Sequence, residues 1–184
     1  MYGLINKAVE GLVRSRFGAE TWHRIRMRAG LKDEPFVSME QYGDEMTYGL
    51  VAAASEELGV PAEAILEEFG VYWVRYTADA GYGELMKTAG RTLPEFLANL
   101  DQMHTRVQLS FPNLRPPSFT VRNATDDSLE LHYYSERAGL APLVVGLLKG
   151  LGERFGLALE ITVRRVEDGR PHDAFDVRWK KASA

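Results

Sequence analysis

The spacing of apolar residues changes near residue 111, and this change limits the folds open to the chain. Up to residue 109, apolar side chains recur every three or four positions, which is the period of amphipathic helices. The segment 111–117 reads Phe-Pro-Asn-Leu-Arg-Pro-Pro, and its prolines cannot continue a helix. Beyond it, alternating apolar residues predict two strand pairs around one more helix. Helices first and strands later indicate an α+β fold, mainly helical at the N-terminus, with a C-terminal antiparallel sheet and helices.

Glycine, proline and capping residues set the expected element boundaries. Gly18 and Gly59 end helices, Pro61 opens one, and Thr92 with Glu95 forms a capping signature. The Gly81-Tyr82-Gly83 triplet lacks a third glycine and a preceding strand, so we interpret it as a turn. The predicted helices cover 1–17, 19–29, 44–58, 61–76, 92–107 and 138–155, and the predicted strands cover 119–121, 129–134, 157–166 and 174–179, the last two joined by a turn at 167–169.

Composition narrows the class of protein. A chain of 184 residues with 45% hydrophobic and 26% charged residues is long enough for one sizeable core, so we expect a single domain over 1–184. The net charge of −4 gives no reason to expect a nucleic acid or an anionic membrane as a partner. The chain has no cysteine, which excludes disulfides and thiolate metal sites and suits the cytoplasm. Its apolar runs are too short to span a membrane, and no signal peptide is evident.

Motifs of enzymes are absent from the sequence, so we do not expect an enzyme. There is no nucleophile elbow, P-loop, His-Glu-x-x-His or EF-hand loop. The spacing of His23, His132 and His172 suggests no metal site, and we expect all three on the surface. Arg24, Arg26 and Arg28 alternate by two, which on a helix distributes them around a solvated surface. No position in this group points to catalysis.

His104 lies on an apolar helix face. Leu100, Met103 and Val107 recur at helical spacing, and His104 falls between them on the side expected to face inward. A histidine in that position either forms a hydrogen bond within the core or binds something. Taken alone, the pattern favours the structural role.

A row of hydrogen-bond donors ends the second predicted strand. The strand period of two places Tyr133, Ser135 and Arg137 on one side, with a phenol, a hydroxyl and a guanidinium. Such a row suits a carboxylate or a phosphate, which arginine can bind with two parallel hydrogen bonds. A solvent-facing strand edge is an equally good explanation of these three residues alone. Together, however, an inward histidine, this donor row and wide apolar helix faces match the requirements of haem.

The chain resembles the H-NOX (haem nitric oxide/oxygen binding) family, which includes the sensor domain of soluble guanylate cyclase. The resemblance covers essentially the whole sequence. It rests on Met-Tyr-Gly-Leu-Ile-Asn-Lys-Ala at the start, on Leu-Asp-Gln-Met-His104 followed by Phe-Pro-Asn-Leu-Arg-Pro-Pro, and on Tyr133-x-Ser135-x-Arg137. The combination of the Tyr-x-Ser-x-Arg pattern with a histidine about thirty residues before it is fairly specific, whereas either part alone would be weak.

The resemblance implies haem b held between the helical part and the sheet. His104 would be the proximal iron ligand, and Tyr133, Ser135 and Arg137 would hold the propionates. Pro117 would press on the porphyrin, although the adjacent Pro116 is an alternative for that role. The remaining contacts implied are Ile5 near the ring, with Trp73, Leu143 and Leu147 along the distal side.

The resemblance also implies a preference among gases. Bound dioxygen needs a hydrogen-bond donor, whereas nitric oxide binds ferrous iron without one. Oxygen-binding members of the family carry a tyrosine on the helix after the donor row, and residues 138–155 contain none. We therefore expect a sensor of nitric oxide and carbon monoxide that discriminates against dioxygen, with the indole N–H of Trp73 as the exception to test.

Signalling would then follow from the iron–His104 bond. In the family, nitric oxide weakens that bond, so the helix carrying His104 could shift and signal to a separate effector, such as a histidine kinase or a cyclic-di-nucleotide enzyme. Two other hypotheses remain. In one, the chain is a haem-free interaction module in which His104 is structural. In the other, His104 is the general base of an enzyme, for which the sequence offers no partner.

Overall fold

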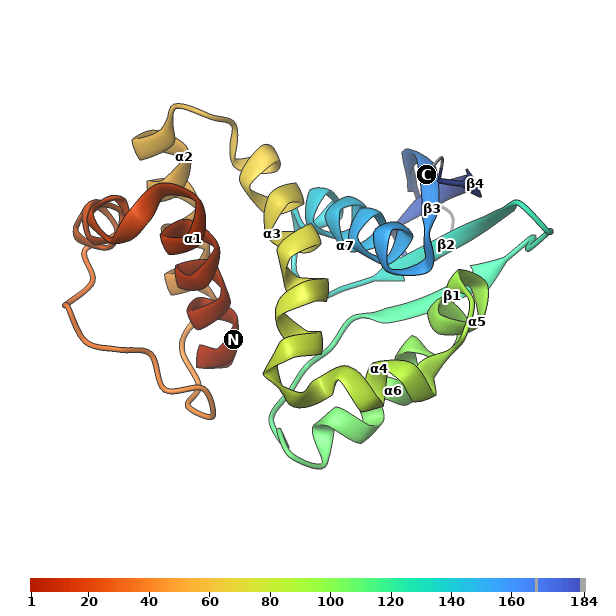
Figure 1. The fold of residues 1–184 in the computed structure, drawn as a ribbon, viewed down its shortest axis with the longest axis horizontal. Coiled ribbons are helices and arrows are strands. Elements are labelled where there is room, and N and C mark those ends of the chain that lie inside the picture. The colour runs from red at the N-terminus through yellow and green to blue at the C-terminus, as the bar shows by residue number, and fades with distance from the viewer. Residues whose placement is uncertain (168, 183–184) are drawn as a thin grey trace.

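The computed structural model describes residues 1–167 and 169–182. Its elements follow one another as α1 to α6, then two strands, α7 and two more strands (Figure 1). The helical N-terminal part and the antiparallel sheet agree with the predicted α+β fold. The bounds are α1 Gly3–Arg28, α2 Asp44–Leu58, α3 Ala62–Thr77, η1 Ala78–Tyr82, α4 Gly83–Ala89, α5 Leu93–Ala98, α6 Leu100–Gln108, β1 Ser118–Arg122, β2 Ser128–Tyr134, α7 Ala141–Phe155, β3 Leu157–Val166 and β4 His172–Lys181.

The two helices predicted on either side of Gly18 form the two halves of α1. Gly18 has a φ of 86° inside this helix, so the chain kinks there as its glycine predicts. Arg26 corrects the prediction of solvated arginines, because it is only 4% exposed. Its guanidinium donates hydrogen bonds to the backbone carbonyls of Lys32 and Glu34, in the loop that follows α1. Those carbonyls offset part of the cost of burying its charge, while its Nε atom has no hydrogen-bond partner among the described residues. Sequence spacing does not reveal these contacts.

The chain stays helical where a turn was predicted. After α3 it continues through the wider π-helical turn η1 into α4, and Gly81 has a φ of 96° within η1. The Gly-x-Gly triplet therefore supplies backbone freedom for a π turn instead of ending the helix, so the turn prediction was wrong. Pro61 precedes α3 as its N-cap residue, one position before the place predicted for it.

The predicted helix carrying His104 is broken into α5 and α6. Thr92 caps α5 as expected, because its side-chain oxygen accepts a hydrogen bond from the Glu95 N–H at 3.3 Å. The break falls at Asn99, whose side-chain amide donates to the carbonyl of Ala89 at 2.8 Å. This hydrogen bond ties the end of α5 to the last residue of α4. His104 thus lies on a nine-residue helix that is separate from α5.

The four strands form one antiparallel sheet in the order β1-β2-β4-β3 among the described residues. All four predicted strands are present, and β3 has the predicted bounds. The predicted turn at 167–169 includes Asp168, which lies outside the described residues. Alternate residues of β2 and β4, such as Leu131, Phe175 and Val177, are almost completely buried and belong to the core that also contains α7. Their neighbours in sequence point to the opposite face of the sheet.

The hydrophobic side chains form two core clusters. One lies among α1, α2 and α3, around Ile25 and Leu50, and the other joins the sheet, α4, α5 and α7. The helices α3 and α7 cross closely at two glycines: a Cβ at Gly146 would lie 1.9 Å from the carbonyl oxygen of Glu67, and one at Gly70 would lie 2.4 Å from that of Leu143. Within the described residues, no helix has both the length and the hydropathy to cross a bilayer.

Candidate functional site

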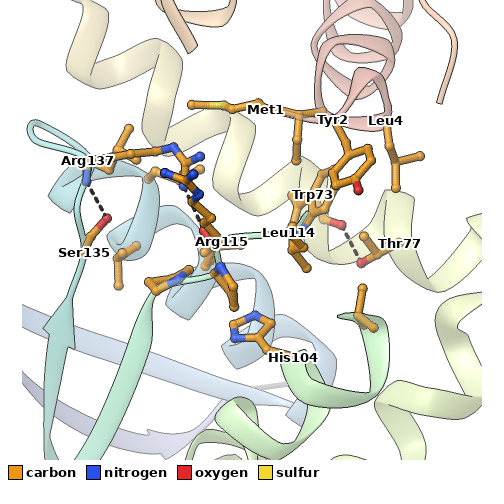
Figure 2. Close-up of a pocket in the computed structure, with 18 of the residues that line it drawn as sticks. Met1, Tyr2, Leu4, Trp73, Thr77, His104, Leu114, Arg115, Ser135 and Arg137 are labelled. Carbon is orange, nitrogen blue, oxygen red and sulfur yellow. Dashed lines mark hydrogen bonds between the residues drawn. The ribbon is translucent and has the colours of Figure 1, made fainter. Parts of the chain in front are cut away.

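A cavity of about 920 Å³ lies between the helical part and the sheet. That is near the upper end of the volumes typical of small-molecule and cofactor sites. Figure 2 shows His104 below Tyr2 and Leu4, with Ser135 and Arg137 together at one end. All nine predicted site residues line this cavity, although they come from α1, α3, α6, α7, β2 and the segments beside β1 and β2: Ile5, Trp73, His104, Pro117, Tyr133, Ser135, Arg137, Leu143 and Leu147.

His104 presents a neutral imidazole to the cavity. Its Nδ1 atom is buried and finds no hydrogen-bond partner among the residues that the structure describes. Burial lowers the pKa of His104, although the nearby Asp101 charge and the carbonyl of Pro117 oppose this shift. An uncharged imidazole with an unpaired buried nitrogen costs stability in an empty protein. The same properties suit an imidazole that ligates a metal.

Asp101 fixes the helix that carries His104. Its carboxylate accepts hydrogen bonds from the Ser118 hydroxyl at 2.7 Å and from the Phe119 N–H at 2.9 Å, both at the start of β1. The ring of Phe119 in turn lies 6.1 Å from that of His104 and 5.4 Å from that of Tyr133. The sequence reasoning missed Asp101, because its partners follow the proline segment and no local pattern pairs them.

The donor row at the end of β2 lies at the cavity, but its arginine already has partners. Tyr133 is 4% exposed, and burial raises the pKa of its phenol. Ser135 accepts a hydrogen bond from the Arg137 N–H at 3.0 Å. The guanidinium of Arg137 donates to both carboxylate oxygens of Asp44, at 2.7 and 3.3 Å, and to the carbonyl of Arg115 at 2.9 Å.

Asp44 therefore joins α2 to the loop after β2. The hydrogen bond from Arg137 lowers the pKa of Asp44, and the amino group of Met1 contributes through a contact of 2.7 Å. Sequence reasoning missed this residue because ninety-three positions separate it from Arg137. Its place in the first turn of a helix signals only a favourable interaction with the helix dipole.

The cavity wall opposite His104 is mainly apolar. Trp73 stacks on Tyr76 with ring centroids 6.0 Å apart, while Leu143 and Leu147 contribute aliphatic surface from α7. Polar lining residues that the sequence reasoning did not select include Tyr48 and Thr77. Both hydroxyls donate inside the protein, Tyr48 to the carbonyl of Ala138 and Thr77 to that of Trp73.

Two histidines expected on the surface are buried instead. His132 is 4% and His172 is 6% exposed, so the prediction was wrong for both. They lie on β2 and β4 and contact each other across the sheet, with His132 Nδ1 2.6 Å from His172 Nε2. Forty residues separate the two positions, so only strand pairing brings them together. His23 is exposed, as predicted.

The residues of the cavity fit a haem group. Among the described residues, no three histidine, cysteine, aspartate or glutamate side chains are grouped so as to hold a metal ion. A haem iron needs no such group, because the ring supplies most of its ligands, so a single imidazole such as that of His104 would suffice. The apolar walls suit such a ring, and the polar end with Ser135 and Arg137 suits its carboxylates. The Nδ1 atom of this imidazole has no hydrogen-bond partner among the described residues, although the carbonyl of Pro117 interacts with the ring.

Solved structures with the same fold are H-NOX proteins. One from S. oneidensis, in the Fe(II)NO ligation state, superposes with a TM-score of 0.86 at 19% identity, covering 98% of this chain and 100% of that one. An unliganded Fe(II) H-NOX protein from K. algicida gives a TM-score of 0.86 at 24% identity and covers 100% of this chain and 99% of that one. Identities this low establish the fold alone.

Curated relatives are much longer proteins. Soluble guanylate cyclase gcy-35 of Caenorhabditis elegans is 31% identical over 182 residues, which are 95% of this chain and 26% of that protein. Soluble guanylate cyclase gcy-32 of the same organism is 32% identical over 168 residues, 89% of this chain and 25% of that protein. The chain thus spans about a quarter of these relatives. The model of the family described as Haem-NO-binding matches residues 2–163, and the chain accordingly belongs to this family of haem-binding sensor domains.

Proposed function

We propose that residues 1–184 act as one haem-based gas sensor domain that binds nitric oxide and carbon monoxide and discriminates against dioxygen. The observation that carries this proposal is the imidazole of His104, which brings an unpaired buried nitrogen to the wall of an apolar cavity. Haem b would supply a ferrous iron with an open coordination position for a diatomic gas. The cytoplasmic location suggested by the absence of cysteine stays a prediction.

Each predicted residue has a role in this proposal. His104 would ligate the iron, and the Tyr133 phenol, the Ser135 hydroxyl and the Arg137 guanidinium would donate to the propionates. Because Arg137 is bound to Asp44, it would have to share its donors or exchange partners when a propionate arrives. The remaining residues would shape the slot around the ring: Pro117, Ile5, Trp73, Leu143 and Leu147.

The preference for nitric oxide rests on the apolar character of α7 at the cavity. Leu143, Val144 and Leu147 lack the hydrogen-bond donor that bound dioxygen requires. Trp73 is the donor-bearing residue that tests this reasoning. Exposure of the reduced protein to air, and then to nitric oxide, should give a nitrosyl complex but no stable oxygen complex. A stable oxygen complex that disappears in Trp73→Phe would assign the donor to Trp73 and contradict the discrimination.

The output would come from movement of α6. This helix is short, separate from α5, and tied to β1 through Asp101, so a change at His104 reaches the sheet directly. Its last turn leads to Leu109, whose side chain is 83% exposed. We propose that an effector in trans, such as a histidine kinase or a cyclic-di-nucleotide enzyme, reads this movement.

A haem spectrum tests the proposal. Protein purified after expression with haem available should show a Soret band, which His104→Ala abolishes and added imidazole restores. His23→Ala is the matched control, since His23 is exposed on α1 and its loss should leave the band unchanged. Absence of the band in the wild-type protein would favour the haem-free interaction module. Retention of an unchanged band in His104→Ala would reject the ligand role.

Loss of haem tests the donor row separately. Arg137→Ala should release haem to apomyoglobin faster than the wild type, because one charged partner of the propionates is gone. Arg75→Ala is the control, since Arg75 forms an exposed ion pair with Glu153 and does not line the cavity. Equal rates for wild type and Arg137→Ala would contradict the proposed role of Arg137.

A further inference from the structure

A buried histidine pair occupies the face of the sheet that points away from the cavity. Leu131 and Tyr133 face the cavity, so His132, which lies between them on β2, faces the other way. Its partner His172 begins β4, the strand paired with β2 (Figure 1). Burial of two ionisable rings in direct contact is costly, and the proposed gas-sensing role does not explain it.

The hydrogen bonds fix where the protons of the neutral pair lie. His172 Nδ1 is 2.8 Å from the carbonyl oxygen of Arg170, which only accepts, so this nitrogen carries a proton. In a neutral ring the Nε2 atom of His172 is then bare and accepts from His132 Nδ1 at 2.6 Å. His132 Nε2 is consequently the one bare nitrogen left, and it faces the carboxylate of Glu130 at 3.4 Å.

This arrangement admits one additional proton but not two. The first enters at His132 Nε2, where the Glu130 carboxylate receives it. A second would have to enter at His172 Nε2, which already accepts a proton from a nitrogen 2.6 Å away. Two N–H groups cannot point at each other at that distance, so the rings must separate first. The unfolded chain has no such restriction and takes up both protons in acid.

The charged side chains near the pair come from β1, β2, β3 and β4. Glu130 also contacts Arg164 of β3, which in turn contacts Asp176 of β4. Arg122 of β1 and His172 disfavour the charged form of His132, whereas Glu130 favours it. Burial is the largest influence and lowers the pKa of His132 below its ordinary value of 6.5.

One further side chain covers His172, and a second lies over that one. Tyr134 stacks on its ring with centroids 4.3 Å apart, and the guanidinium of Arg170 lies 5.4 Å from the Tyr134 ring. Separation of the two histidines would therefore disturb Tyr134 and the start of β4 together. Tyr133, which lines the cavity, lies between His132 and Tyr134 in β2 and pairs with Asp173 of β4.

We propose that His132 and His172 form an acid-sensitive fastener between β2 and β4, which stays closed with at most one added proton and opens when the second arrives. Because the folded pair binds fewer protons than the unfolded chain below about pH 6.5, its contribution to stability falls as the pH falls. Opening loosens the strand that carries Tyr133 and thereby makes the cavity wall sensitive to acid. This proposal does not depend on what the cavity binds.

An NMR titration of the histidine rings tests the fastener directly. Between pH 8 and pH 5, at constant occupancy of the cavity, the folded wild-type protein should take up one proton on the pair, seen at His132 Nε2. The amides of Tyr133 and Asp173 should shift along the same curve. The ring signals of the exposed His23 serve as the internal reference. Independent charging of both His132 and His172 in the folded protein would overturn the proposal.

A pair of variants provides a second readout. The equilibrium constant for unfolding should rise up to tenfold more per pH unit in the wild type than in His172→Gln, since the glutamine removes the blocked proton site. His23→Gln should retain the wild-type acid sensitivity. If His172→Gln does not fold, His132→Gln takes its place and the NMR titration still decides. Equal acid sensitivity in wild type and the folded variant would overturn the proposal.

Discussion

The helical part meets the sheet core along two very different contacts. On one side α3 and α7 touch backbone to backbone, at Gly70 and Gly146. On the other side the same two parts enclose a cavity of about 920 Å³ into which His104 brings an unpaired nitrogen. The tight contact leaves no room for a methyl group, whereas the hollow contact leaves room for a cofactor.

This difference separates what holds the fold from what gives it a function. The glycine crossing joins two cores that are each almost completely buried, so it fixes the angle between them. The cavity side is held by polar contacts at one end of the cavity, chiefly that of Asp44 with Arg137. Substitutions at the glycine crossing should therefore lower stability. Substitutions in the cavity lining should change binding, while stability falls little or even rises.

The largest expected effect is a methyl group at the tight contact. Gly146→Ala would place a Cβ 1.9 Å from the carbonyl oxygen of Glu67, so α3 and α7 must move apart. We expect a loss of about 3 kcal/mol in the free energy of unfolding, measured by urea denaturation. The matched control is Gly49→Ala on α2, where the structure places nothing within 4 Å and a small gain is expected. Equal stability of the two variants would contradict the tight contact.

The next effect has the opposite sign. In the absence of haem, His104→Leu should raise the free energy of unfolding by about 1.5 kcal/mol, because it removes a buried unpaired nitrogen and fills similar space. The same substitution should abolish the Soret band. Thermal denaturation of haem-free wild type and variant gives the comparison. A loss of stability in the variant would mean that His104 has a structural partner in solution, which is the haem-free hypothesis.

A smaller loss of stability should follow when the polar contact at the end of the cavity is removed. Asp44→Asn leaves the Arg137 guanidinium without its carboxylate. We expect a loss of about 1 kcal/mol in the free energy of unfolding, since solvent partly screens this contact. Glu56→Gln is the control, because its ion pair with Arg28 is exposed and joins α1 to α2 away from the cavity lining. A loss as large as that of Gly146→Ala would remove the distinction between the two contacts.

Local sequence patterns predict most of the elements, because their signals lie within one turn or one strand. Gly59 ends α2 at a left-handed residue, and Thr92 caps α5, as the short-range physics of helix ends requires. The break at Asn99 was missed because the contact of this side chain, from its amide to the carbonyl of Ala89, joins it to the end of another helix ten residues away. Gly81 was misread because the same conformational freedom serves a turn and a π-helical segment.

The lining of the cavity could be predicted, but its polar partners could not. His104 and the donor row follow from helix and strand periods together with a family resemblance, and all of them line one cavity. Asp44 and Asp101 bind groups that only the folded chain brings near them. The burial of His132 depends likewise on the register between β2 and β4. The spacing of residues within one segment does not reveal partners that lie across the sheet or in another part of the fold.

The smallest expected effect is a dependence of this polar contact between Asp44 and Arg137 on acid. The hydrogen bond from Arg137 lowers the pKa of Asp44 below its ordinary value of 3.8, so the folded protein binds fewer protons here than the unfolded chain. The stabilisation is therefore complete above pH 3.8 and is lost as the pH falls through the lowered pKa. Urea denaturation should show a gap between wild type and Asp44→Asn that is constant from pH 7 to pH 5 and narrows below pH 3.8. The histidine pair acts in a higher window, so a gap that narrows already near pH 6 would place the titrating group elsewhere.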